Sequence, residues 1–424
     1  MITRIEVDGF KSLRGFSLEF EPLTAIIGAN GAGKSNLFDV LRLLSLLPRM
    51  NVTEALRSLR GHIRDQFSQT KGGPGNRITI SVEFLLDLAK ANGNQQSTRW
   101  RYFICIERIA RASGMTEELA ITDEKLTSLC STEDSWMANH SDFQPRARYD
   151  DEQNFVVRRE VIDSRWHRVT ASFGRENVHF ERDESPLYSL LWSRDPAYAI
   201  EDIGEELSRI RFLHPDPGQL RLPSERGAGA MLLPDGSNLP TALASTTPEV
   251  RAQIRADLAQ LVPGFRSFDI VPSDDELRLD IEFSDDTRVP ARILSDGTLR
   301  LFAVLTLLRT QRSRGVIAIE EPENGIYPGR LRALVKSLEA AIADVPGQLP
   351  PQIILNSHSP ALVAALHHRP ELLVFADLVR LRDGLRSTRM RHVRSEKTQA
   401  HDHSTVSPDE IEQYLDTARP DEEA

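Results

Sequence analysis

Cysteine is almost absent from this sequence, because its 424 residues include only Cys105 and Cys130. Two cysteines cannot build a disulfide framework, and they show no metal-ligand spacing, which fits a reducing compartment. The sequence also lacks an apolar run near the roughly 20 residues that cross a bilayer, and its first residues read as a strand without a secretory signal. We therefore expect a cytoplasmic protein with no membrane partner.

An excess of positive charge is absent as well, since the formal net charge is −10 at pH 7. Proteins that coat nucleic acid need clustered lysine and arginine, so this balance excludes binding by bulk charge but leaves room for a local basic patch. Lysine is scarce, with seven residues against 45 arginines. A lysine at a position that requires one is therefore informative.

The most informative segment is the glycine-rich run from Gly28 to Ser35, which has the pattern GxxxxGKS between an apolar strand pattern and a helical one. In that context the run predicts a phosphate cradle, whose glycines let backbone N–H groups turn inward. Lys34 would reach the β- and γ-phosphates of a nucleotide, and the Ser35 hydroxyl would bind Mg²⁺. The predicted nucleotide contacts are Asn30, Gly31, Ala32, Gly33, Lys34, Ser35 and Asn36.

Two adjacent carboxylates follow a second buried strand pattern at 316–319. Glu320 would hold Mg²⁺ directly or through water, and Glu321 would orient the attacking water as a general base. With a phosphate cradle upstream, this pattern favours a hydrolytic site over an ordinary acidic turn.

A third buried strand pattern, at 353–355, is followed by Asn-Ser-His-Ser-Pro. Strand ends in such sheets face the ligand crevice. His358 is then placed to donate to the γ-phosphate or to hold the attacking water, and the alternative is a histidine that packs at a strand end. The predicted catalytic residues are Lys34, Glu321 and His358.

A serine and a glycine, Ser295 and Gly297, precede a helical pattern at 299–308. Free N–H groups at a helix N-terminus attract anions, although taken alone the pattern is better explained as an N-cap. A second anion site in a chain that already has a phosphate cradle needs a separate explanation.

The motifs divide the chain into four parts. Residues 1–86 predict the first part of a nucleotide-binding lobe, and 87–202 an insertion with strand patterns and a polar, poorly ordered stretch at 131–153. In 203–395 short apolar strands alternate with amphipathic helices, which indicates a mainly parallel α/β sheet covered on both faces. Residues 396–424 predict a short helix with a loose tail.

The order of these motifs resembles that of the ATP-binding-cassette (ABC) ATPases of the SMC/RecF/OLD-like group, and most of all the stand-alone bacterial AAA-family ATPases. The run from Gly9 to Leu13 and the run from Asp235 to Leu239 are also similar to that group. The resemblance covers the N-terminal lobe and about 205–378. It implies an α/β fold, an ABC-type P-loop NTPase head with a mixed, mainly parallel sheet, an antiparallel β subdomain and an inserted α+β arm.

The resemblance also implies ATP and Mg²⁺ as cofactors and hydrolysis of ATP to ADP and phosphate. In that family two heads dimerise on ATP, so Ser295 and Gly297 would contact the γ-phosphate on the partner's P-loop. Asn324 would lie at the dimer seam, and Lys11 would approach the nucleotide. The chain departs from the common pattern at Asp296, where many cassettes have glycine, and at Glu320, where most have aspartate.

Two features remain open. In this fold a glutamine connects the bound metal ion to the part of the head that moves. The sequence does not identify this glutamine, and Gln66 and Gln69 are its nearest candidates. A hairpin with its turn at Asp383-Gly384 carries four arginines that would contact DNA, and the alternative is a solvated arginine-rich face. These arginines are Arg380, Arg382, Arg389 and Arg391.

Three functions compete. The favoured one is an ATP-gated homodimer in DNA repair, genome maintenance or antiviral (anti-phage) defence that controls a separate nuclease or toxin. The second is a transporter-type ATPase subunit, which would need a membrane partner. The third is an ATP-dependent scaffold or antitoxin-like regulator with little turnover, which would have no need of a base at Glu321. No intrinsic nuclease is expected, because no acidic metal-binding set follows His358.

Overall fold

The chain is described here from a computed structural model. It describes residues 1–86, 98–110, 117–149, 155–161, 166–171, 178–181, 183–185, 187, 198–310, 315–343, 349–393, 405–406, 410 and 413–414. None of the helices in these ranges combines the length and the apolar character of a bilayer-spanning segment.

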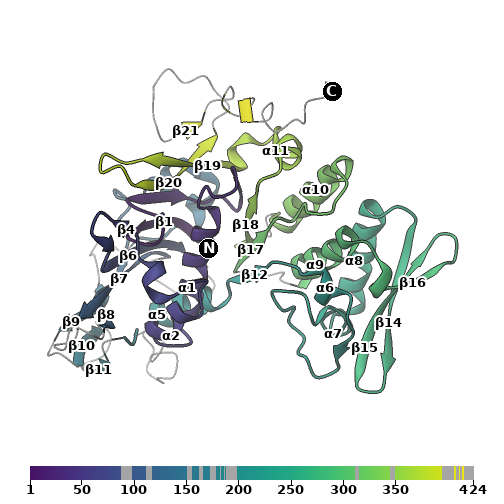
Figure 1. Ribbon diagram of the computed structural model, residues 1–424, viewed down its shortest axis with the longest axis horizontal. Coiled ribbons are helices and arrows are strands. Elements are labelled where there is room, and N and C mark those ends of the chain that lie inside the picture. The colour runs from purple at the N-terminus through teal and green to yellow at the C-terminus, as the bar shows by residue number, and fades with distance from the viewer. Residues whose placement is uncertain are drawn as a thin grey trace.

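A seven-stranded sheet lies at the centre of the fold (Figure 1). Its first five strands run parallel, and the sixth turns back antiparallel to the fifth. In spatial order they are β12 (Arg211–Leu213), β17 (Val316–Glu320), β18 (Gln352–Ser357), β3 (Leu23–Ile27), β19 (Leu373–Arg380), β20 (Arg386–Val393) and β21 (Thr405–Val406). All five residues of β3 are buried, as expected for a strand covered on both faces.

An eight-stranded antiparallel sheet flanks this centre. In spatial order its strands are β11 (Val178–Glu181), β10 (Trp166–Ala171), β9 (Phe155–Val161), β8 (Glu117–Ser128), β7 (Arg99–Ala110), β6 (Arg77–Leu85), β1 (Ile2–Asp8) and β2 (Phe16–Glu19). Strand β7 pairs with β6 from Arg99 to Glu107. The predicted insertion therefore extends the antiparallel sheet of the head, while the boundaries at 86 and 202 stay predictions.

The helices fall into two groups around the central sheet (Figure 1). Near the N-terminal strands lie α1 (Lys34–Leu46), α2 (Val52–Arg57), α3 (Ser135–Asn139) and α5 (Tyr198–Ser208). The other group comprises α6 (Pro217–Leu220), α7 (Leu239–Ala244), α8 (Pro248–Leu261), α9 (Asp296–Thr310), α10 (Leu331–Ala341) and α11 (Pro360–Leu366). Helices α6 to α9 form a second lobe with a four-stranded antiparallel sheet of β13 (Ser224–Glu225), β15 (Glu276–Phe283), β14 (Phe265–Ser273) and β16 (Arg288–Pro290).

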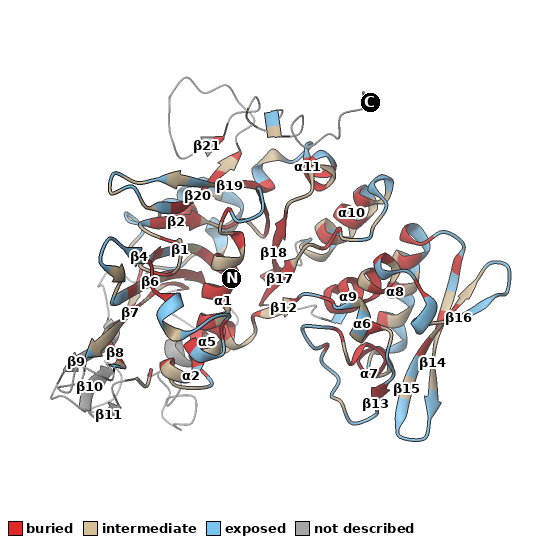
Figure 2. Ribbon diagram, in the orientation of Figure 1, coloured by how far each residue is buried: buried red, intermediate tan, exposed pale blue. Residues whose placement is uncertain are grey.

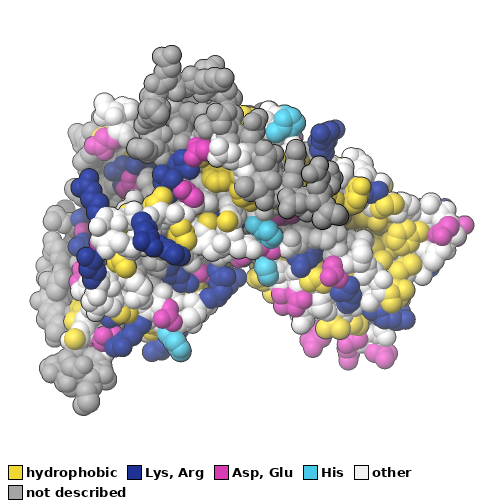
Figure 3. Space-filling model, turned by 45° about the horizontal axis from the view of Figure 1, so that its top comes forward, with side chains coloured by type: hydrophobic (Ala, Val, Ile, Leu, Met, Phe, Trp, Pro, Cys, Tyr) yellow, Lys and Arg dark blue, Asp and Glu magenta, His cyan; other side chains and the backbone are white. Residues whose placement is uncertain are grey.

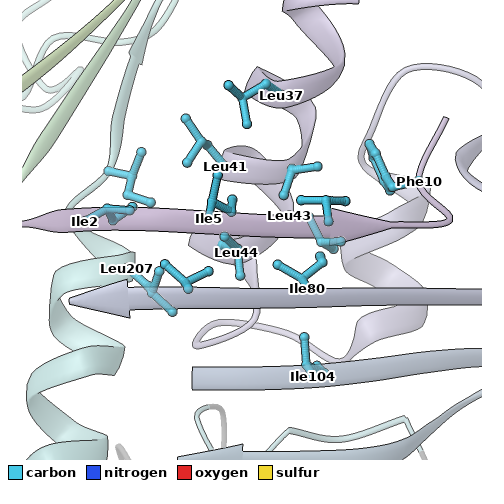
Figure 4. Packing of buried hydrophobic residues seen from close by; sticks show 14 of the residues in the cluster. Ile2, Ile5, Phe10, Leu37, Leu41, Leu43, Leu44, Ile80, Ile104 and Leu207 are labelled. Carbon is cyan, nitrogen blue, oxygen red and sulfur yellow. The ribbon is translucent and has the colours of Figure 1, made fainter. Parts of the chain in front are cut away.

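The central sheet separates two hydrophobic cores because its side chains alternate between faces. Its strands β17 and β18 are mostly buried (Figure 2). In β17, Val316 and Ala318 join the first core, whereas Ile317 and Ile319 join the second. The first core lies between the antiparallel sheet and α1, where Leu41 and Leu44 meet residues of β1 (Figure 4). The predicted mainly parallel sheet covered on both faces is confirmed.

Two predictions about polar segments need correction. The stretch 131–153 is ordered where the structure describes it: α3 carries Trp136, which is fully buried, and Asp134 pairs with Arg99 at 2.6 Å, with both side chains inaccessible. The tail is not loose throughout, since Val406 is buried where β21 pairs with β20.

Candidate nucleotide site

The catalytic groups predicted from sequence meet at one edge of the central sheet. Parallel strands place their carboxyl ends at the same edge. The glycine-rich loop follows β3, Glu320 ends β17, and His358 follows β18, which lies between these two strands. Figure 3 shows histidine side chains at the junction of the two lobes. This edge is the candidate site.

The glycine-rich loop has the geometry of an anion cradle. Gly31 and Gly33 have φ of 80° and 91°, in the left-handed region that glycine tolerates best. The amide of Ala32 donates to Ala29, but no acceptor in the described part of the chain takes the amides of Gly31 and Gly33. Helix α1 begins at Lys34, so its dipole also favours an anion here.

The Lys34 side chain curls into this loop. Its ammonium donates to the carbonyls of Gly28 at 2.6 Å and Ala29 at 2.9 Å. Burial lowers the pKa of Lys34, and the nearby carboxylates of Glu321 and Glu323 oppose that shift. The cation is therefore partly desolvated in a site built for negative charge, where an electrostatic contact is stronger than in water.

Residues from distant segments support the loop from behind. The Thr388 hydroxyl on β20 donates to the Ala32 carbonyl at 3.1 Å, and it lies 2.5 Å from the Ser12 hydroxyl. Ser12 in turn accepts from Asn36 at 2.7 Å. A Cβ on Gly33 would lie 1.8 Å from the Thr388 hydroxyl oxygen, so only glycine fits. Asn36 thus braces the loop, whereas a nucleotide contact from its side chain stays a prediction.

Glu321 and His358 lie against each other. The Nδ1 atom of His358 is 3.1 Å from Oε1 of Glu321, and Asn324 Nδ2 donates to Oε2 of the same carboxylate. Glu321 has φ of 48°, which is rare outside glycine, and its amide donates to Asn356 at 2.7 Å. Strained backbone held by its surroundings is common at functional sites. The arrangement can orient a water molecule and take its proton.

The groups expected to bind Mg²⁺ lie around Asn356. Glu320 and Asn356 are direct partners in the pairing of β17 with β18. The Asn356 side chain reaches to 3.5 Å from the Ser35 hydroxyl. The Ser35 hydroxyl and the Glu320 carboxylate supply oxygen ligands of the kind that Mg²⁺ prefers, so these residue types fit the ion.

A third carboxylate of the same run, Glu323, was missed by sequence reasoning. It is 5% exposed, accepts from the Ser357 hydroxyl, and its Oε2 has no hydrogen-bond partner among the described residues. Burial raises its pKa, against the effects of Ser357 and His358. The residues next to Glu323 do not distinguish it from an exposed turn residue. Its position shortly after the buried strand β17 was the one signal that could have identified it.

The second predicted anion site has a different geometry. Ser295 caps α9, since its hydroxyl accepts from the Thr298 amide at 3.3 Å. Gly297 is buried, and a Cβ there would lie 1.8 Å from the Gly325 carbonyl oxygen. Arg221 holds this turn by donating to the Leu294 carbonyl at 3.0 Å. Close packing therefore accounts for Gly297, and contact of Ser295 and Gly297 with a partner's nucleotide stays a prediction.

Lys11 lies beside the loop, but its ammonium pairs with Asp39 on α1 at 2.6 Å. Gln66 is fully buried and its side chain donates to the carbonyls of Arg60 and His62. Gln69 is exposed on the short strand β4 (Gln69–Thr70), which pairs with β5 (Gly73–Pro74). Of the two glutamines, Gln66 lies nearer the loop through its carbonyl, which accepts from Lys11 at 2.8 Å.

The arginine-bearing hairpin is confirmed as β19 and β20, but two of its arginines are already engaged. Arg389 pairs with Asp377, and Arg391, which is 8% exposed, pairs with Glu410 at 3.0 Å. Their charge is already paired within the protein, and a DNA contact from these two residues stays a prediction. Arg380 and Arg382 are exposed, as predicted for a contact surface.

Comparison with known proteins gives one matching family model, described as "AAA domain, putative AbiEii toxin, Type IV TA system", over residues 23–364. That range begins with β3 and ends in α11, so it includes the glycine-rich loop, Ser295, Glu320, Glu321 and His358. Structural maintenance of chromosomes protein 1 of Schizosaccharomyces pombe is 35% identical over 123 residues, which covers 27% of this chain and only 9% of that protein.

Solved SMC heads share the fold. One, bound to the C-winged helix domain of ScpA, matches with a TM-score of 0.51 and 12% identity over 92% of this chain and 98% of that chain. Another, from Pyrococcus furiosus, has an extended coiled coil and is bound to the C-terminal domain of ScpA. It matches with a TM-score of 0.50 and 11% identity over 92% of this chain and 96% of that chain. The expected NTPase head is thereby confirmed.

Proposed function

The chain belongs to the AAA-domain family whose model it matches, an SMC-like group of ATPases, and we propose that it hydrolyses ATP between two heads to control a separate effector. One observation carries this proposal: the phosphate loop, the Glu321–His358 pair and the Ser35–Asn356–Glu320 group lie at one sheet edge. A protein that only bound ATP would have no need of a carboxylate that Asn324 holds beside a histidine.

The chemistry follows from the groups present. Lys34 and the loop amides hold the phosphates and stabilise charge on the transferred phosphoryl group. Glu321 takes a proton from the attacking water, while Asn324 holds one of its oxygens and His358 lies 3.1 Å from the other. When bound to Ser35 and Glu320, Mg²⁺ would supply charge neutralisation. The products are ADP and phosphate.

The second nucleotide contact would come from a second copy of the chain. Ser295 is exposed at the start of α9. No described element of the same chain brings it to the phosphate loop, so an ATP-dependent homodimer is the arrangement in which it can act. Asn324, which donates to Glu321, would then lie at the dimer seam, so that contact with the partner would affect the position of Glu321.

The effector and DNA contacts are further parts of the proposal. The two SMC heads are bound to a domain of another protein, ScpA, which supports a separate protein partner for this chain. DNA would bind at the hairpin through Arg380 and Arg382. Arg380 lies directly opposite Arg386 in the strand pairing, and both are exposed. Like charges in that position repel each other, so a phosphate between them would relieve the repulsion. We place this activity in cytoplasmic defence or DNA repair.

A second candidate function is an antitoxin-like regulator of a toxic partner. The description of the matching family names a type IV toxin–antitoxin system, in which a toxin and its regulator work as a pair, although it describes the family as the "putative AbiEii toxin". In that case ATP would assemble the complex with little turnover. The role of Glu321 distinguishes the two candidates.

The test measures turnover and assembly together. Wild-type protein with ATP and Mg²⁺ should release phosphate, and Glu321→Gln should lower kcat by about a hundredfold or more while accumulating an ATP-bound dimer in light scattering. Glu371→Gln, an exposed residue remote from the site, is the control. Equal turnover in Glu321→Gln and wild type would reject the base, and a monomeric Glu321→Gln protein with ATP bound would reject the dimer.

DNA binding needs its own measurement. The triple change of Arg380, Arg382 and Arg386 to alanine should reduce the salt slope of duplex binding by about three, and Arg332→Ala, exposed on α10, should leave it unchanged. Binding that does not depend on salt, or no binding, would favour the regulator.

A further inference from the structure

The segment around 405–414 is anchored on the hairpin and reaches the candidate site. Strand β21 pairs in parallel with the end of β20, and Val406 is 2% exposed in the second core. Four residues later, Glu410 accepts from Arg391 at 3.0 Å. These contacts hold Val406 and Glu410, two described residues of a tail that the sequence predicted to be loose.

Tyr414 brings this segment to the catalytic histidine. Its hydroxyl donates to the His358 carbonyl at 2.9 Å, across 56 residues of sequence. Its ring meets Phe375 edge-on, with centroids 5.1 Å apart and planes at 88°. Phe375 is the direct strand partner of Ile27, the residue before the glycine-rich loop. The contact therefore lies next to the phosphate cradle.

The hydroxyl of Tyr414 is suited to donate. Burial raises the pKa of Tyr414, and Glu323 adds to that shift. A phenol whose pKa is raised stays protonated at neutral pH, so it keeps its hydrogen bond to a carbonyl, which can only accept.

The peptide between His358 and Ser359 is held through both of its polar groups. Its N–H donates to the Ser357 hydroxyl at 3.0 Å, and that hydroxyl donates to Glu323. Its carbonyl accepts from Tyr414. The direction of a side chain follows the orientation of its peptide planes. The Tyr414 contact therefore influences whether the imidazole stays 3.1 Å from Glu321.

We propose that Tyr414 is a positioning residue for ATP hydrolysis, which holds the His358 loop through its hydroxyl so that the imidazole faces Glu321. The proposal rests on the proposed ATPase function and adds a segment that no motif of the site includes. The Tyr414 contact then affects turnover, while nucleotide binding does not depend on it.

The test compares two tyrosine-to-phenylalanine changes. Tyr414→Phe keeps the ring on Phe375 and removes the hydroxyl, so we expect kcat to fall about twofold to tenfold, the effect of one net hydrogen bond, with KM for ATP unchanged. Tyr149→Phe is the matched control, because it removes a partly buried hydroxyl bonded at 2.9 Å to Asp134, far from the site. Wild-type kcat in Tyr414→Phe, or an equal loss in Tyr149→Phe, would overturn the proposal.

A double-mutant cycle separates positioning from general stability. If Tyr414 acts through His358, Tyr414→Phe should have no further effect on kcat in a His358→Ala background, whereas independent roles would add. Additive losses, or wild-type turnover in His358→Ala, would overturn the proposal.

Hydrogen exchange tests the contact without turnover. Amides of 357–363 should exchange faster in Tyr414→Phe than in Tyr149→Phe, and equal exchange would overturn the contact. A wild-type protein that failed to hydrolyse ATP would reject the proposed function instead, and hydrogen exchange would still decide whether Tyr414 holds the loop.

Discussion

The loop before α1 and the turn before α9 both place glycine at the N-terminus of a helix, but their glycines serve different purposes. Gly31 has φ of 80° and nothing within 4 Å of where a Cβ would lie, so the chain leaves space for a ligand. At Gly297 the same construction meets the Gly325 carbonyl at 1.8 Å, so the space is filled by the chain itself. Sequence alone makes both look like anion sites.

The difference between the two helix starts separates nucleotide binding by one head from the assembly of two heads. The loop before α1 is a complete cradle within one chain, with Lys34 and open amides. The turn before α9 has an exposed serine above a tightly packed backbone. Arg221 holds this turn through a hydrogen bond to the Leu294 carbonyl. Under the proposed function, the first would bind phosphate in a single head, and the second would contribute only when another head supplies the phosphate. Substitutions at the two helix starts should therefore have opposite effects.

The largest effect is expected at Lys34. Lys34→Ala removes the one ammonium in the cradle, and we expect ATP turnover to fall about a hundredfold or more, as for loss of a preorganised charge at a transition state. Phosphate release in steady state is the measurement. Lys336→Ala, exposed on α10, should keep wild-type turnover. Turnover within threefold of wild type in Lys34→Ala would show that the cradle is not the catalytic site.

A crossed pair of glycine changes comes next. Gly297→Ala should lower the free energy of unfolding by about 1–3 kcal/mol, because its methyl group meets backbone that cannot move aside. ATP affinity of the single head should stay unchanged. Gly31→Ala should cost only about 1 kcal/mol for its positive φ and weaken ATP binding. Chemical unfolding and calorimetric titration measure both quantities, and the reverse pattern would invalidate the comparison.

The sequence predicted those parts of the site that follow local rules. Strand, glycine-rich loop and helix are consecutive, and carboxylates after a buried strand must emerge at the sheet edge where parallel strands end. Lys34, Glu320, Glu321 and His358 were found in this way. The fold class followed from alternating apolar strands and helices, which the sheet order confirms.

The parts that the sequence did not predict depend on contacts between distant segments. Glu323 and Tyr414 have no periodic pattern, and their meaning comes from what folding places beside them. The stretch 131–153 looked poorly ordered because it is polar, yet the Asp134–Arg99 ion pair is inaccessible and α3 buries Trp136. The sequence pattern of the hairpin suggested that Arg391 is a surface residue, whereas in the structure it pairs with Glu410.

A smaller effect is expected at the exposed serine of the second turn. Ser295→Ala removes the cap of α9, so the free energy of unfolding should fall by about 1 kcal/mol. ATP affinity of a single head should not change. Urea unfolding and titration of monomeric protein test both statements. Weaker ATP binding by monomer would mean that Ser295 belongs to the cradle of its own chain, and the contrast between the two turns would disappear.

The smallest effect concerns the carboxyl group that links the cradle to the His358 loop. Burial raises the pKa of Glu323 above its ordinary value of 4.5, so the folded protein binds this proton more tightly than the unfolded chain does. The stability that this group contributes is therefore present below pH 4.5 and declines as pH rises towards the folded pKa. Glu323→Gln stays neutral and can still accept from Ser357. Its melting temperature should match wild type at low pH and exceed it increasingly above pH 4.5, whereas Glu339→Gln on α10 should show no such trend. If the melting-temperature difference between Glu323→Gln and wild type shrank with rising pH, Glu323 would be stabilised as a carboxylate by Lys34. The cradle would then hold a fixed negative charge that repels the phosphates it is proposed to bind.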